Sequence, residues 1–101
     1  MTETDMVIAI REAISPVARL AQLQEEAAEL AQACSKLLRI LDGTNPTPVT
    51  EEEAWNNLYE EFDDVQNAAQ IVGIRGSKLR QWCKKVRWLE RIQEAKRHAE
   101  D

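Results

Sequence analysis

The segment from Pro16 to Asp42, PVARLAQLQEEAAELAQACSKLLRILD, decides the fold of this chain. Its apolar residues recur at alternating intervals of three and four, which is the spacing of one helical face: Leu20, Leu23, Ala27, Leu30, Cys34, Leu37 and Leu41. Ser15 and Pro16 are typical of a helix N-terminus, and Gly43 is typical of a helix end. We therefore expect a long helix over 16–42 whose apolar stripe packs against another helix.

Three further segments show helical patterns, a short one within 1–15 and two long ones over 51–72 and 77–99. Thr50 and Ser77 are suited to begin the two long helices. Their apolar stripes are Trp55, Leu58, Phe62, Val65, Ala69 and Val72 in one, and Leu79, Trp82, Val86 and Leu89 in the other. Gly43-Thr-Asn-Pro-Thr-Pro-Val is the clear loop, and no segment alternates with the period of a strand. The prediction is one all-α domain over 1–101, a three- to four-helix bundle that assembles as an oligomer.

Composition excludes several classes of protein. No apolar run approaches the roughly 20 residues that span a bilayer, and the N-terminus MTETDMVIAI lacks the basic region of a signal peptide. We expect a cytoplasmic protein without a membrane partner, in which Cys34 and Cys83 stay reduced. The single histidine, His98, argues against a catalytic triad, a Cys/His zinc site and a di-iron bundle.

Charge is unevenly distributed along the chain, whose net charge is −5. Residues 1–73 carry 14 acidic and 4 basic side chains, whereas residues 74–101 carry 4 acidic and 9 basic ones. The acidic body would repel a phosphate backbone, so nucleic-acid binding through the basic segment is disfavoured.

Two expected helices carry dense acids, in Glu25-Glu26-Ala-Ala-Glu29 and Glu60-Glu61-Phe-Asp63-Asp64. At about 100° per residue, Glu26 lies roughly 60° from the apolar stripe of its helix and Glu29 roughly 120°, on the same side. Glu61 and Asp64 lie roughly 70° and 130° from theirs, again on one side. Each helix therefore offers one acid at the edge of its apolar stripe and a second acid just outside it.

Acids at this spacing are also common on solvated helix faces. Such faces usually include a basic residue four positions on, however, and none of these acids has one. Uncompensated carboxylates beside a core repel one another unless a cation is present. The pattern therefore favours a site for Mg²⁺, with Mn²⁺ as the other hard cation that oxygen ligands suit.

The two acidic motifs resemble the EExxE…ExxD signature of the all-α NTP pyrophosphohydrolases, which include the MazG-like proteins and dimeric dUTPases. The wider strings LQEEAAELAQA at 23–33 and LYEEFDDV at 58–65 are similar to small phage-type members, and the resemblance covers about 16–90. The 31 residues between Glu29 and Glu61 are more than is usual for the family, and the loop at 43–50 can absorb them. The resemblance implies Mg²⁺-dependent hydrolysis of a nucleoside or deoxynucleoside triphosphate to the monophosphate and pyrophosphate. It also implies that Glu26, Glu29, Glu61 and Asp64 hold the metal and form the catalytic site.

A triphosphate needs cationic contacts beyond the metal. Lys78 and Lys85 lie two turns apart on one face of the last helix, and a basic residue early in this helix is similar to the family's phosphate contact. Lys36 and Asn57 lie within two turns of the acids on the same helical sides, so both are candidate substrate contacts. The alternative interpretation of the lysines is a solvated face that balances the acidic body.

Two functions remain open at this point. The first is a metal-dependent nucleotide pyrophosphohydrolase that binds a nucleotide and assembles with itself as a homodimer or homotetramer. The second is a non-catalytic helical module whose acidic and basic faces pair between subunits. Two like-charged pairs in matching register favour the enzyme, because an interaction module has no need of them.

Overall fold

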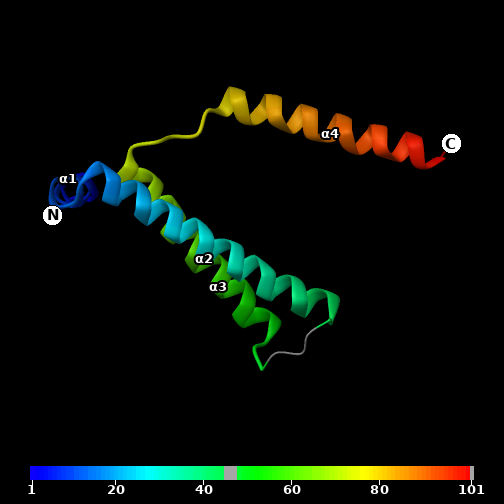
Figure 1. The fold of residues 1–101 in the computed structure, drawn as a ribbon, viewed down its shortest axis with the longest axis horizontal. Helices are drawn as coiled ribbons and strands as arrows, with labels where there is room; N and C mark the ends of the chain where they lie inside the picture. Colours follow the sequence, from blue (N-terminus) through cyan, green and yellow to red (C-terminus); the bar gives the residue numbers. More distant parts are fainter. Residues whose placement is uncertain (45–47, 101) are drawn as a thin grey trace.

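The computed structural model describes residues 1–44 and 48–100, and within these ranges the chain forms four α-helices and no strand (Figure 1). They are α1 (Glu3–Ala13), α2 (Pro16–Asp42), α3 (Glu51–Val72) and α4 (Lys78–Glu100). The all-α class is confirmed, and each helix begins and ends within two residues of its predicted bounds. Residues 45–47 of the predicted loop lie outside the described residues. Throughout the described ranges, each helix is too short or too polar to cross a bilayer.

Helix ends follow from local hydrogen-bonding residues and glycines. The hydroxyls of Ser15, Thr50 and Ser77 each accept a hydrogen bond at 3.1 Å from the backbone N–H three residues on. These bonds satisfy N–H groups that have no partner inside the helix. Gly43 and Gly73 end α2 and α3 with φ angles of 70° and 94°, a left-handed conformation that glycine adopts without steric strain.

Helices α2 and α3 run antiparallel and pack along their length to form a hairpin (Figure 1). The buried side chains between them come from Ala33 and Leu37 on α2 and from Ala54 and Ala68 on α3. Because three of these four residues are alanines, the two helices can approach closely. The side chains beside this contact therefore reach across to the facing helix.

The predicted apolar stripes coincide only in part with the faces that the hairpin buries. Leu37 is buried, and Leu30 and Val65 are half-buried, but other members of the stripes are exposed. On α2, Leu20 is 60% exposed and Cys34 is also exposed, although both belong to the predicted stripe. On α3, Trp55 is 40% exposed and Phe62 is 48% exposed. The prediction that the stripes pack between α2 and α3 is therefore confirmed for Leu37. It is wrong for these four exposed residues, because the contact is displaced toward the small alanines to one side of each stripe. The large apolar side chains form a second, uncovered face.

Two arginines fasten α1 across the end of the hairpin. Arg11 Nη1 donates a hydrogen bond of 2.6 Å to the carbonyl of Ile71, near the C-terminus of α3. Arg19, in the first turns of α2, donates from Nη2 to the carbonyl of Arg11 at 2.7 Å and from Nε to that of Ile14 at 3.2 Å. Carbonyls at helix C-termini lack partners inside the helix, so these cationic donors satisfy them.

Helix α4 stands apart from the hairpin (Figure 1). None of the residues from 78 to 100 is buried, and Leu79 and Trp82 are 73% and 63% exposed. The prediction that Leu79, Trp82, Val86 and Leu89 pack inside the bundle of a single chain is therefore wrong. The radius of gyration is 18.4 Å, whereas a compact chain of this length would have one of about 13 Å.

Candidate metal centre

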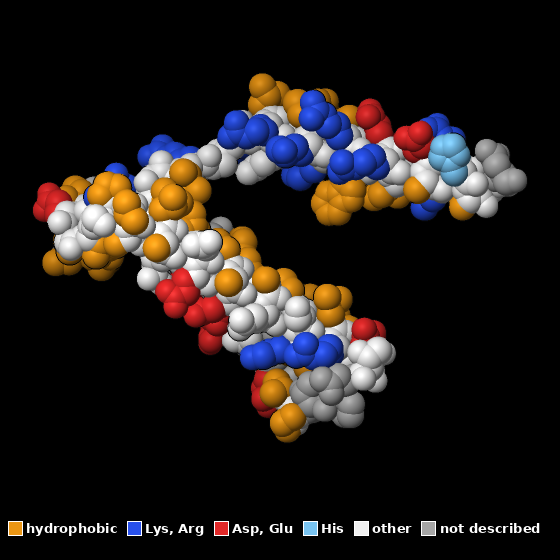
Figure 2. All heavy atoms as spheres, viewed as in Figure 1, with side chains coloured by type: hydrophobic (Ala, Val, Ile, Leu, Met, Phe, Trp, Pro, Cys, Tyr) orange, Lys and Arg blue, Asp and Glu red, His pale blue; other side chains and the backbone are white. Residues whose placement is uncertain are grey.

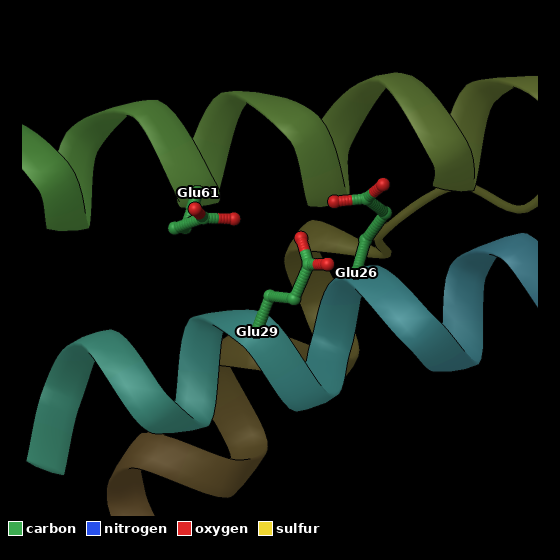
Figure 3. Close-up of side chains that lie close together, drawn as sticks. All are labelled: Glu26, Glu29 and Glu61. Carbon is green, nitrogen blue, oxygen red and sulfur yellow. The ribbon is translucent and has the colours of Figure 1, made fainter.

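Three glutamates from the two hairpin helices converge on one point (Figure 3). Glu26 and Glu29 project from α2 toward α3, and Glu61 projects from α3 toward α2. One carboxylate oxygen of each lies within 4.8 Å of those of the other two, and all three side chains are half-buried. Glu26 and Glu29 share a helix surface because they are three residues apart, and the alanine-lined contact brings Glu61 within reach.

Two oxygens of this cluster are buried without a partner. Oε2 of Glu26 and Oε2 of Glu61 have almost no solvent contact and accept no hydrogen bond. The other oxygen of Glu26, Oε1, accepts a hydrogen bond of 2.7 Å from Nε2 of Gln22, one turn earlier on α2. A buried carboxylate oxygen without a hydrogen bond or cation is unfavourable, so both oxygens retain the capacity to accept a further bond.

Electrostatic repulsion within the cluster raises the pKa of Glu29. The largest cause is the charge of Glu26, followed by partial desolvation, a hydrogen bond with Glu26, and the charges of Glu61 and Glu25. Among the described residues, the one contact at ion-pair distance joins His98 and Glu94 on α4, far along the sequence from the cluster. The three carboxylates therefore have no basic partner to offset their repulsion.

The donor set fits a hard divalent cation. All ligand atoms are carboxylate oxygens, which suit Mg²⁺ and Mn²⁺ rather than the softer metals that histidine and cysteine bind. Exposed acidic groups are common without a metal. In this cluster, however, three carboxylates converge and two of their oxygens are also buried without a partner. Glu26, Glu29 and Glu61 are thus the residues that could hold such an ion.

The fourth predicted ligand, Asp64, lies beside this cluster rather than in it. Asp64 is exposed, and its carboxylate is outside the group of three within the described chain. It shares a hollow of about 200 Å³ with Glu26, Gln22 and Asn67. The structure therefore brings three of the four predicted acids together and leaves Asp64 as the neighbour of Glu26.

Lys36 and Asn57 lie together, as their predicted common role requires. Both line a hollow of about 250 Å³ between α2 and α3. Arg39 lines the same hollow, and its Nε is buried without a hydrogen-bond partner. Arg39 was not among the predicted contacts, although its position three residues after Lys36 was the available signal. The hollow offers a cationic donor set one turn of α3 away from Glu61.

Lys78 and Lys85 lie on α4 and are not brought to the acids within one chain. Both are exposed. Figure 2 shows basic side chains gathered along α4, while the hairpin carries acidic side chains along one edge. Their predicted contact with a phosphate stays a prediction, and it would need α4 to lie closer to an acidic cluster than it does here.

Comparison with known proteins adds no relative. The chain matches no family model, no curated protein and no solved structure. The resemblance to the all-α pyrophosphohydrolases therefore rests on the two acidic motifs of the sequence, and the convergence of Glu26, Glu29 and Glu61 is an independent structural observation.

Proposed function

We propose that the protein is a Mg²⁺-dependent hydrolase that converts a nucleoside or deoxynucleoside triphosphate to the monophosphate and pyrophosphate. The observation that carries the proposal is the convergence of Glu26, Glu29 and Glu61 with two buried, unpartnered oxygens. Such a cluster is unfavourable as a structural element, because its like charges repel. A divalent cation between the helices would remove that repulsion.

Each residue has a part in this chemistry. Glu26, Glu29 and Glu61 would hold the ion, which supplies charge neutralisation for the phosphates. Hydrolysis joins the oxygen of a water molecule to the α-phosphorus and breaks the bond from that phosphorus to the oxygen of the β-phosphate. One acid of this site, Asp64 included, orients the water and accepts its proton.

The hollow of Lys36, Arg39 and Asn57 is suited to the far phosphates of the substrate. Asn57 precedes Glu61 by one helical turn, a rise of about 6 Å, so the hollow opens next to the carboxylates. Charged donors on a phosphate form shorter and stronger hydrogen bonds than neutral ones. The buried Nε of Arg39 would then gain an acceptor.

The decisive experiment compares two adjacent glutamates of α3. Purified protein with Mg²⁺ is incubated with a panel of canonical and modified triphosphates, and release of monophosphate and pyrophosphate is followed. Glu61→Gln should lower turnover by roughly 100-fold or more, as loss of a charge-stabilising group in a catalytic site commonly does. Glu60→Gln is the matched control and should retain turnover within about twofold, because Glu60 is exposed outside the cluster.

A negative result has a defined form. The proposal fails if no triphosphate is hydrolysed with Mg²⁺ or Mn²⁺ and Glu61→Gln leaves metal affinity unchanged. The second candidate, a non-catalytic helical interaction module, is favoured by the exposed apolar side chains of α4. That module would show self-association without turnover and without any response of its stability to Mg²⁺.

A further inference from the structure

The structure leaves two apolar surfaces uncovered, one on α4 and one on the hairpin. The first, called the α4 stripe, consists of Leu79, Trp82, Val86 and Leu89. The second, called the hairpin face, consists of Leu20, Cys34 and Leu38 on α2 with Trp55, Tyr59 and Phe62 on α3. We propose that the α4 stripe of one copy of this chain packs on the hairpin face of a second copy.

The parts of the hairpin face that come from α2 and α3 lie on the same side of the hairpin. On α2, Leu20 and Leu38 lie about 110° around the helix from the buried contact, and on α3 Trp55 and Phe62 lie about 100° from it in the same sense of rotation. The axes of α2 and α3 point in opposite directions. Equal rotations in the same sense about these two axes, starting from the buried contact, therefore lead to the same side of the hairpin.

The acid cluster lies toward the other face of the hairpin. Glu29 is reached by the opposite rotation, about 60° from the contact. Figure 2 agrees with this division, with hydrophobic atoms along the edge of the hairpin that is turned toward α4 and acidic atoms along the other edge. A partner on the hairpin face would therefore leave the carboxylates open to substrate.

The exposed area matches what a stable dimer buries. The chain exposes 8429 Å², whereas a compact protein of 11.5 kDa would expose about 5,800 Å². The excess of about 2,600 Å² is similar to the share that one subunit buries in a large obligate interface. A few scattered exposed side chains would not produce an excess of this size.

Charge complementarity selects the hairpin as the occupant of the α4 stripe. Glu52 and Asp63 are exposed on the outer side of Tyr59, and they give the rim of the hairpin face a negative charge. Lys78 and Lys85 lie about 70° around α4 from its stripe and give one edge of that stripe a positive charge, whereas Glu90 lies at the other edge. An antiparallel pair of α4 helices from two copies would instead bring the lysine edges together, which is unfavourable.

Arg11 holds the chain where it leaves α3. Gly73 has a left-handed φ of 94°, and a Cβ there would lie 2.9 Å from Nη1 of Arg11. The same Arg11 nitrogen bonds the carbonyl of Ile71, so the last turn of α3 and the exit of the chain are held together. Residues 74–77 then lead without helical structure to α4, which stands apart from its own hairpin and leaves both apolar surfaces free for another copy (Figure 1). A two-fold axis would make the exchange reciprocal.

The two cysteines of the chain provide a direct test. Cys34 lies on the hairpin face and Cys83 lies next to the α4 stripe, and both are exposed. Cys34→Ser and Cys83→Ser chains, one of them isotopically labelled, are unfolded together, refolded and treated with a short bis-maleimide. We expect a cross-linked peptide that joins Cys83 of one chain to Cys34 of the other. The absence of that peptide overturns the proposal. The proposal is also overturned if wild-type protein treated in the same way forms the Cys34–Cys83 cross-link only within single chains.

A matched pair of tryptophans provides the second test. Trp82 in the α4 stripe and Trp88 on another side of α4 are 63% and 62% exposed in the single chain. In sedimentation experiments on the full chain, Trp82→Glu should weaken dimerisation at least tenfold, while Trp88→Glu should change it by no more than twofold. Circular dichroism checks that both variants stay helical. A monomeric wild type, or equal effects of the two substitutions, overturns the proposal.

Discussion

Helices α3 and α4 differ in length by one residue, yet α3 packs against another helix of the chain and α4 does not. Helix α3 has 22 residues, is acidic and buries Ala54 and Ala68 against α2. Helix α4 has 23 residues, is basic and buries nothing along 78–100. Both carry an apolar stripe of helical spacing. The difference shows that an amphipathic pattern determines that a helix will pack, but not which chain supplies its partner.

The largest expected contrast concerns one leucine in each region. Leu37→Ala removes the one large buried side chain of the hairpin core and should lower the free energy of unfolding by about 2–5 kcal/mol. Leu89→Ala on α4, where the leucine side chain is 54% exposed, should lower the free energy of unfolding by less than about 0.5 kcal/mol in dilute, monomeric protein. Urea denaturation followed by circular dichroism measures both. Equal losses would mean that α4 belongs to the core of its own chain.

The two left-handed glycines sharpen the comparison at the joint before α4. Gly43→Ala meets open space, so only its φ of 70° is strained, and we expect a loss of about 1 kcal/mol. Gly73→Ala also places a Cβ against the Arg11 guanidinium, so we expect a larger loss of up to about 3 kcal/mol. Thermal unfolding of the two variants side by side checks the order. The reverse order would show that the Arg11 contact does not restrain the joint.

The N-terminal caps of α3 and α4 offer a smaller contrast. Thr50→Ala removes the hydrogen bond to the N–H of Glu53 and should destabilise the hairpin by about 1 kcal/mol. Ser77→Ala removes the equivalent bond from the N–H of Arg80. The first turn of α4 packs no buried side chain, so the loss should stay local. Hydrogen exchange of the monomer should therefore change across the hairpin for Thr50→Ala and only within 78–81 for Ser77→Ala. A global change in both would contradict the separation of the two regions.

The smallest expected effect is the pH dependence of the acid cluster. The folded pKa of Glu29 is raised above its ordinary value of 4.5, mainly by the charge of Glu26. Its contribution to stability is therefore fully present below that ordinary value and is lost as the pH rises through the folded pKa. In EDTA, Glu29→Gln should melt above wild type near pH 7, and this advantage should vanish near pH 4.

The matched control for the metal response is Glu90→Gln, which removes an exposed carboxylate of α4 outside the cluster and should leave that response unchanged. Mg²⁺ should raise the Tm of wild type and leave that of Glu29→Gln nearly unchanged, because binding to the folded state alone stabilises it. A wild-type Tm that is insensitive to Mg²⁺ would contradict the assignment of the metal centre.

Local features were predictable from the sequence. Caps at Ser15, Thr50 and Ser77 and glycines at 43 and 73 each act within a few residues, so the helix bounds could be inferred without tertiary information. Convergence of Glu26, Glu29 and Glu61 was predictable in part, because their spacing puts them beside the surfaces where the two helices pack. The same spacing also included Asp64, which lies outside the cluster.

The exact packing face and the place of α4 were not predictable in this way. Hydrophobic spacing weights Trp55 and Phe62 above Ala54 and Ala68, yet the alanines form the contact because they allow close approach. The stripe of α4 has the same spacing whether its own chain or another covers it. Arg39 was missed for a similar reason, since only the folded hairpin shows that its Nε is buried beside Lys36 and Asn57.

The small core has a consequence for how the stability of the fold depends on protein concentration. A core of three alanines and one leucine removes little apolar surface from water, so a separate subunit has little free energy to hold its fold. If copies of the chain cover each other's apolar faces, unfolding becomes a reaction in which one assembly yields two coils. Dilution then lowers the stability of the fold, and the melting temperature rises with protein concentration.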